Sequence, residues 1–245
     1  MSTIAHILER YTMTLEKPEE VGRDEWFLDW VLRAPGHAGK HLTAGWHAMA
    51  SLRDVYGPTE LEGVREYFGG MGAQALMAQE LFDIKGHTVL EYSEQAVDHL
   101  RKAIPFATVK HADSYDASSW GPADFVILDF GDLTAWKTRD GEKHRQLLNR
   151  VFAHRPKAVL LTDIAARYLH LHRERYESLL GPGTCESYET YLYALVARLE
   201  ELYGYTMVEG YSHRWSTVMA LVPGKPEQRG FIYDVPAEPV GLELL

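Results

Sequence analysis

The chain has 245 residues, of which 46% are hydrophobic and 24% charged, and its formal net charge at pH 7 is −10. This composition supplies a sizeable core, but no apolar run approaches the roughly 20 residues needed to cross a bilayer, so we expect no membrane span. The acidic balance argues against a non-specific binder of polyanions. Cys185 is the single cysteine, which excludes an intrachain disulfide and a cysteine-based metal cluster. The first residues lack the basic and apolar segments of a secretory signal, which favours a cytoplasmic location.

Residues 1–58 are predicted to form a helical extension before the main domain. Asp24 can cap a helix that carries Trp26 and Trp30 on one side. A second helix is expected over 44–55, where a Gly-Pro turn ends it.

Residues 36–46 are interpreted as a loop, because Pro35 and Gly39 oppose a helix in this part of the chain. His37 and His41 have the i, i+4 spacing of zinc ligands on a helix. Since we expect a loop there, we predict no metal site.

A strand, a glycine-rich turn and the start of a helix follow one another over residues 64–82. The turn reads Glu-Tyr-Phe-Gly-Gly-Met-Gly from Glu66 to Gly72. Its glycines lie where the chain must reverse from strand to helix with little space. The helix that follows has apolar residues at i, i+3, i+4 and i+8, so its free N–H groups would face the turn. The pattern indicates a place where a ligand can approach bare backbone.

Strand and helix patterns alternate from Glu62 on, which is typical of a mainly parallel sheet with helices on both faces. The seven predicted strands are 63–68, 87–92, 107–111, 124–130, 158–162, 205–211 and 217–222. Ser187 is predicted to begin a long helix that Gly204 ends. A short polar link joins the last two strands, so they can pair antiparallel. Prolines in 223–245 oppose regular structure, and we expect an extended tail that Phe231, Ile232 and Tyr233 could anchor, either to this domain or to a partner subunit.

Acidic residues stand at the ends of the predicted strands, where open α/β sheets hold their ligands. These residues are Glu66, Glu91, Asp113, Asp129 and Asp163. With the glycine turn, their order over residues 62–222 resembles the class I S-adenosylmethionine (SAM) methyltransferases. The resemblance implies an α/β fold with a seven-stranded, mainly parallel Rossmann-like sheet, helices on both faces, an antiparallel final hairpin and an N-terminal helical extension. It also implies SAM as the cofactor.

The first motif of this family is an acid followed by three alternating glycines. On this chain the acid falls on Glu66 and the first glycine position holds Phe68, which departs from the family pattern. The resemblance further implies that Glu91 accepts the ribose hydroxyls and that Asp113 contacts the adenine. The residues assigned in this way to SAM are Glu66, Phe68, Gly69, Gly70, Gly72, Glu91, Tyr92, Asp113 and Ser114.

Asp129 is the predicted catalytic residue, because it directly follows the apolar run of the fourth strand and would emerge beside the reactive end of the cofactor. A carboxylate there can orient a nucleophilic amine or hydroxyl, or take its proton. Asp132 is a second candidate for the same role. Either acid could instead cap the following turn.

The methyl acceptor is not identified by the sequence. The chain lacks both the Asn/Asp-Pro-Pro-aromatic motif of amino-methylating DNA enzymes and the Pro-Cys nucleophile of cytosine-C5 enzymes. Residues 137–175 carry ten Lys or Arg against four acids, so this segment could contact nucleic-acid phosphates or an acidic substrate. It could equally be a solvated helix face, and a homo-oligomer remains open.

Three parts are therefore expected: a helical extension or lid at 1–58, a SAM-binding domain at 59–222 and an extended tail at 223–245. The predicted function is SAM-dependent methyl transfer to an unidentified acceptor, with a nucleic-acid base as one candidate. The alternative is a protein that keeps the methyltransferase-like fold for binding or structure and has lost turnover, which the Phe68 substitution allows.

Overall fold

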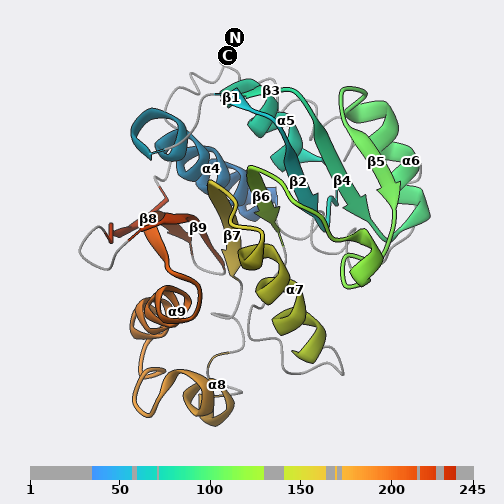
Figure 1. Cartoon of the computed structure of the whole chain (residues 1–245). Helices are drawn as coiled ribbons and strands as arrows, with labels where there is room; N and C mark the ends of the chain where they lie inside the picture. Colours follow the sequence, from blue (N-terminus) through green and yellow to red (C-terminus); the bar gives the residue numbers. More distant parts are fainter. Residues whose placement is uncertain are drawn as a thin grey trace.

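The structure is a computed structural model that describes residues 35–56, 60–70, 72–129, 141–163, 169, 173–213, 216–224 and 229–235. An eight-stranded sheet forms its centre, in the order β10-β8-β9-β7-β6-β2-β4-β5 (Figure 1). Its strands are β2 (Val64–Tyr67), β4 (His87–Glu91), β5 (Thr108–His111), β6 (Phe125–Leu128), β7 (Ala158–Asp163), β8 (Tyr205–His213), β9 (Ser216–Pro223) and β10 (Ile232–Asp234). Two short parallel strands, β1 (Glu60–Leu61) and β3 (Asp83–Ile84), pair separately.

All seven predicted strands are present, and the predicted α/β fold is confirmed. Strands β5, β4, β2, β6 and β7 pair in parallel, whereas β9 runs antiparallel to both β7 and β8. The predicted final hairpin is therefore β8 and β9. In the register of the central strands Leu128 lies opposite both Tyr67 and Leu161, so the carboxyl ends of β2 and β6 are level at one edge of the sheet and β7 extends two residues further.

Helices α4 (Pro35–Ser51), α5 (Ala73–Leu81) and α6 (Glu94–Ala103) cover one face of the sheet. Helix α4 continues into a π-helical turn, Leu52–Tyr56. It packs against α5 at Gly45, where an added Cβ would come within 2.9 Å of Gln74 Oε1. It is also tied to β8, because the Ser51 hydroxyl donates a hydrogen bond to Glu209.

The expected loop at 36–46 is wrong, because these residues belong to α4. Pro35 stands at the first position of the helix, where its missing N–H would have no partner within the helix and its fixed φ suits the helical backbone. Packing of the following turns on β8, β9 and α5 outweighs the poor helix propensity of the glycines. The predicted helix carrying Trp26 and Trp30 lies outside the described residues.

Helices α7 (Gly141–Ala153) and α9 (Tyr188–Tyr203) cover the opposite face, as Figure 1 shows. Successive residues of a strand point to opposite faces, so Val126 and Leu128 of β6 pack under α7 and α9, while Phe125 and Ile127 pack under α4 and α5. Strand β6 is buried at every position. The alternation of faces therefore decides which strand-end side chains can meet.

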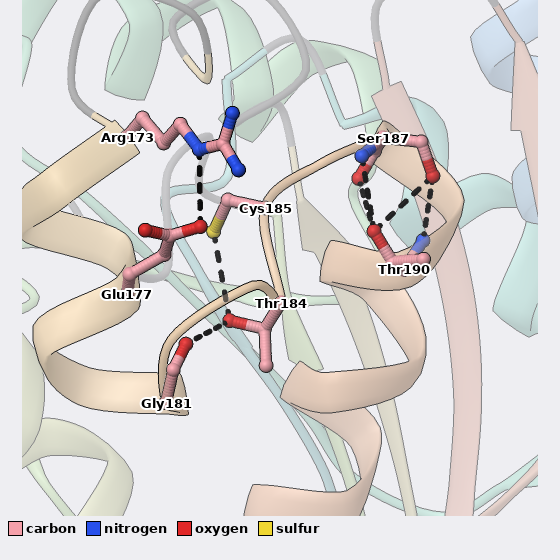
Figure 2. A network of polar contacts seen from close by, with 7 residues as sticks. All are labelled: Arg173, Glu177, Gly181, Thr184, Cys185, Ser187 and Thr190. Atoms are coloured by element: carbon pink, nitrogen blue, oxygen red, sulfur yellow. Dashed lines mark hydrogen bonds and ion pairs between the residues drawn. The ribbon is translucent and has the colours of Figure 1, made fainter.

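Helix α8 (Arg173–Leu180) precedes α9, and polar contacts occur both within α8 and in the connection between the two helices (Figure 2). The Thr184 hydroxyl donates to Gly181 O at 2.6 Å, and Arg173 Nε donates to Glu177 Oε1 at 3.0 Å. Cys185 is buried beside Thr184, and burial raises the pKa of its thiol above the ordinary value. Cys185 belongs to the main cluster of buried apolar side chains, so it contributes to packing.

The predicted ends of α9 are confirmed by its caps. The Ser187 hydroxyl accepts a hydrogen bond from Thr190 N at 3.1 Å, and the Thr190 hydroxyl accepts one from Ser187 N at 3.0 Å. This reciprocal pair, also visible in Figure 2, is a capping box. Gly204 ends the helix with φ 71°, in the left-handed region that glycine adopts without steric cost.

The tail adds an eighth strand that the sequence did not predict. Strand β10 pairs in parallel with β8, with Tyr233 opposite Tyr211. The two rings lie 5.7 Å apart between centroids, although Phe231 is 66% exposed and Tyr233 is 44% exposed. The tail was expected to be anchored either to this domain or to a partner subunit, and β10 anchors it to this domain.

Replacing Gly230 by alanine is expected to detach β10. An added Cβ would lie 1.8 Å from Val208 O and 2.7 Å from Val208 C, and both are backbone atoms that cannot move without breaking β8. We expect overpacking of about 1–3 kcal/mol, with faster cleavage of the tail in limited proteolysis. Gly63→Ala is the control, because an added Cβ there meets nothing within 4 Å. Equal cleavage rates in the two variants would contradict this role of Gly230.

Among the helices that the structure describes, none has the length and apolar character needed to cross a membrane.

Candidate functional site

The predicted turn after β2 has the backbone that a strand-to-helix reversal requires. Phe68, Gly70 and Gly72 have φ values of 63°, 51° and 79°. Gly69 is needed for space, because a Cβ there would lie 2.2 Å from Val89 Cγ1. Gly69 N donates to Leu90 O at 3.0 Å, which holds the turn against the neighbouring strand β4.

Phe68, which the sequence resemblance places at the first glycine position of the motif, has a left-handed backbone conformation. Such a conformation is uncommon for a bulky residue and costs about 1–2 kcal/mol. Two contacts hold it: Phe68 N donates to Ser114 Oγ at 3.1 Å, and its ring lies 5.2 Å from that of Tyr115. These contacts support a bulky residue in a backbone conformation that glycine adopts without steric cost.

A cavity of about 250 Å³ lies beside this turn. Its lining residues are Phe68, Glu91, Tyr92, Asp113, Ser114 and Tyr115. The cavity joins the carboxyl ends of β2, β4 and β5, and its walls combine three aromatic rings with two carboxyl groups. The aromatic side chains can therefore pack against a ring system of a ligand, and the carboxyl groups can accept hydrogen bonds from its hydroxyl or amino groups.

The Glu91 carboxylate connects the glycine turn after β2 to the residues that follow β4. Its Oε2 accepts a hydrogen bond from Gly70 N at 2.9 Å, and its Oε1 accepts one from Ser93 N at 2.8 Å. Each carboxylate oxygen has two acceptor sites, so both can accept a further hydrogen bond from a ligand. Beside it, Tyr92 is 73% exposed, and its carbonyl oxygen lies 2.8 Å from His111 Nε2.

Asp113 and Ser114 are ordered by a compact turn after β5. Asp113 Oδ1 accepts from Tyr115 N at 2.9 Å, while Trp120 Nε1 donates to Ser114 O at 2.9 Å. The Ser119 hydroxyl donates to Asp113 O at 3.0 Å. The Ser114 side chain is buried and supports Phe68, so its role is to shape the cavity wall.

Glu66 is close to this site but does not line the cavity. It is 1% exposed. Burial, and then the nearby carboxylates of Asp129 and Glu91, raise its pKa well above the ordinary value. His87 Nε2 lies 3.6 Å from Glu66 Oε2, and burial lowers the pKa of His87 to about 4. Glu66 and His87 are therefore buried behind the turn and lie outside the cavity lining.

Asp129 directly follows β6 and is half-buried. Its carboxylate contributes to the raised pKa of Glu66, because both acids lie at the same end of the sheet. Asp132 lies outside the described residues, so the choice between Asp129 and Asp132 as the catalytic acid stays a prediction.

Asp163, at the end of β7, is separated from the cavity. It is fully buried, and its Oδ1 and Oδ2 accept hydrogen bonds from Tyr191 at 3.2 Å and from Tyr188 at 3.3 Å. Both tyrosines belong to α9. This carboxylate anchors α9 to the sheet.

Two residues of the site went unnoticed in the sequence. Tyr115 lines the cavity, and an aromatic residue two positions after the predicted adenine-contacting Asp113 was the available signal. His87 is the first residue of β4. No local pattern distinguishes it from an exposed strand-end histidine, since only the fold brings it to Glu66.

His37 and His41 lie in α4, and no group of three potential metal-ligating side chains occurs among the described residues. In the basic segment, Arg145, Arg150 and Arg155 are exposed near or on α7. Lys157 pairs with Asp124 at 3.4 Å.

Known structures share this fold. A Pyrococcus horikoshii protein named as a candidate RNA methyltransferase matches 77% of this chain and 84% of its own, with 14% identity and a TM-score of 0.50. The methyltransferase domain of the bacterial protein CtHen1-C matches 76% of this chain and 100% of its own, with 12% identity and a TM-score of 0.50. No protein-family model matches the sequence, and no curated protein matches it either. The chain has the fold of the class I SAM-dependent methyltransferases, as the resemblance predicted.

Proposed function

We propose that the protein is a SAM-dependent methyltransferase. The observation that carries this proposal is the cavity between β2, β4 and β5, in which the Glu91 carboxylate is held by the N–H of Gly70 in the glycine turn. A carboxylate at this point of an open α/β sheet suits the hydroxyls of a ribose.

The cavity residues fit the nucleoside part of SAM. Both Glu91 oxygens retain acceptor capacity for the ribose hydroxyls. The half-buried Asp113 can accept from an adenine amino group, and the rings of Tyr92 and Tyr115 offer apolar walls. When bound, SAM supplies a methyl group that is activated by its positively charged sulfur.

The chain's own contribution to the reaction is the orientation of the acceptor. Methyl transfer is an in-line displacement, in which correct positioning of the two reactants accounts for much of the rate increase. The Asp129 carboxylate can orient an amine or hydroxyl and receive its proton. A nucleic-acid base is one candidate acceptor, supported by the exposed Arg145, Arg150 and Arg155.

Calorimetric titration with SAM and S-adenosylhomocysteine tests the proposal directly, because both ligands share the adenosine that the cavity would hold. Binding of neither ligand would contradict it. To identify the acceptor, a cell extract would be incubated with labelled SAM and the protein, and mass shifts compared among nucleic acids, proteins and small molecules.

One observation favours the second candidate, a protein that keeps the fold but has lost turnover. Phe68 brings a ring into the cavity at the position where the family has glycine. If this ring blocks the cofactor, the wild-type protein will bind no SAM and Phe68→Gly will restore binding.

If the protein is instead an active enzyme, we expect wild-type binding, and a change of less than about tenfold, or about 1.4 kcal/mol, in Phe68→Gly. In that case glycine would relieve backbone strain while losing ring contacts, two effects of similar size. The measurement is SAM titration of both proteins, with circular dichroism to verify folding.

A further inference from the structure

Behind the proposed cofactor site, Glu66 of β2 and His87 of β4 form a pair of buried polar side chains. Each side chain is 1% exposed, and Glu66 Oε2 lies 3.6 Å from His87 Nε2. Among the described residues, neither Glu66 Oε2 nor either ring nitrogen of His87 has a hydrogen-bond partner. Buried polar atoms normally have partners, and each exception calls for an explanation.

The surroundings of Glu66 are negatively charged or neutral. From β4 it meets Glu91 as well as His87, and Asp129 follows β6. Helix α5 faces the sheet with uncharged residues only, namely Gln74, Ala75, Met77, Ala78 and Leu81. No described cation is among the groups that act on the charge of Glu66, and burial disfavours the charged form of His87. Three carboxyl groups thus gather at the end of the sheet where the proposed cofactor would bring a positive charge.

Electrostatics favours a protonated, neutral Glu66 in the free protein. Burial opposes its ionisation, and the two neighbouring carboxylates oppose it further. His87 is also kept neutral by burial. A fixed positive charge bound near these acids would act in the opposite direction and favour ionised Glu66.

We propose that the Glu66–His87 pair makes this site sensitive to the charge of its ligand, so that SAM binding releases a proton and S-adenosylhomocysteine binding does not. The inference rests on the proposed function. The two ligands differ in the charge at sulfur, and their amino, carboxyl and nucleoside groups are the same. Any difference in proton release therefore reports on groups near the sulfur. Since methyl transfer removes the positive charge, Glu66 would regain its proton from solvent and favour release of the product.

The direction of the pH dependence follows from linkage. A ligand that releases a proton binds more tightly as pH rises, by up to tenfold per pH unit for one proton. Because the pKa of Glu66 is raised in the free protein, we expect SAM affinity to rise relative to S-adenosylhomocysteine affinity as pH increases above the range in which an exposed glutamate loses its proton. Calorimetry of the full chain, in two buffers with different ionisation heats, measures the proton count for each ligand. Equal counts for both ligands would overturn the proposal.

Variants identify the source of the proton. Glu66→Gln should remove the difference in proton release between the two ligands. If that difference persists, Glu66 is not its source and the proposal fails. His87→Leu removes the neutral ring whose N–H can donate to the ionised Glu66 carboxylate, so the rise in SAM affinity should move to higher pH. An unchanged pH profile in His87→Leu would exclude His87 from the pair.

One measurement needs no ligand and separates this proposal from the proposed function. The carbon-13 shift of the Glu66 carboxyl, assigned by comparison with Glu66→Gln, reports its ionisation in the free protein. We expect the Glu66 carboxyl to stay neutral at a pH where exposed glutamates are ionised, and an ionised carboxyl there would overturn the inference whether or not SAM binds. Failure of both ligands to bind, with Glu66 neutral, would overturn the proposed function and with it the coupling to ligand charge, and only the neutral state of Glu66 would stand.

Discussion

Gly70→Val is expected to weaken SAM binding at least about 100-fold, which corresponds to about 2.7 kcal/mol. Gly70 has φ 51°, and a β-branched residue is a strong outlier in that region. The variant would therefore shift the turn and misplace the N–H that donates to Glu91 Oε2. Valine would also place a branched side chain where the proposed cofactor approaches the backbone. Titration calorimetry with SAM measures the loss.

The local space at Gly70 makes this variant informative. An added Cβ would have Phe68 O at 3.8 Å as its nearest neighbour, so the substitution fits the folded core and acts through backbone conformation. At Gly69, by contrast, a Cβ would collide with Val89, and loss of binding there would be confused with loss of packing. Gly63→Val serves as the matched control, because it adds the same side chain at the start of β2, where space is open. Wild-type affinity in Gly70→Val would mean that SAM binds elsewhere.

The sheet could be predicted from the sequence because its strands are short apolar runs separated by helical patterns. Strand β6, for example, is buried at every position, and four apolar residues bounded by Asp124 and Asp129 reveal it. The glycine turn was equally visible, since its geometry depends on residue type within a few positions. Such local signals do not depend on tertiary context.

Other features depend on contacts between distant residues. The helix at 36–46 forms despite its glycines because α4 packs on α5 and β8, and β10 forms because β8 offers an edge. The pairing of Glu66 with His87 joins two strands and has no sequence period. Likewise, Asp163 looked equivalent to Asp129, but its side chain hydrogen-bonds to Tyr188 and Tyr191 of α9.

Asp129→Asn is expected to reduce the rate of methyl transfer by roughly 100-fold, the size of effect typical of a lost proton acceptor, while SAM affinity changes by less than about tenfold. Asparagine keeps the shape and one hydrogen-bond acceptor of aspartate but removes its charge. In the cofactor cavity the lining groups come from β2, β4 and β5, whereas Asp129 follows β6, so binding and turnover should separate.

The measurement for Asp129 is single-turnover methyl transfer beside SAM titration, once an acceptor is known. Asp124→Asn is the matched control, because Asp124 precedes β6 at its opposite end and pairs with Lys157. If Asp129 has only a structural role, Asp129→Asn should lower the melting temperature in proportion to the lost activity. Asp124→Asn, which loses the pair with Lys157, should show the same proportion. Unchanged turnover in Asp129→Asn would transfer the proposed role to Asp132. Unchanged turnover in Asp129→Asn and also in Asp132→Asn would remove these two acids from the mechanism.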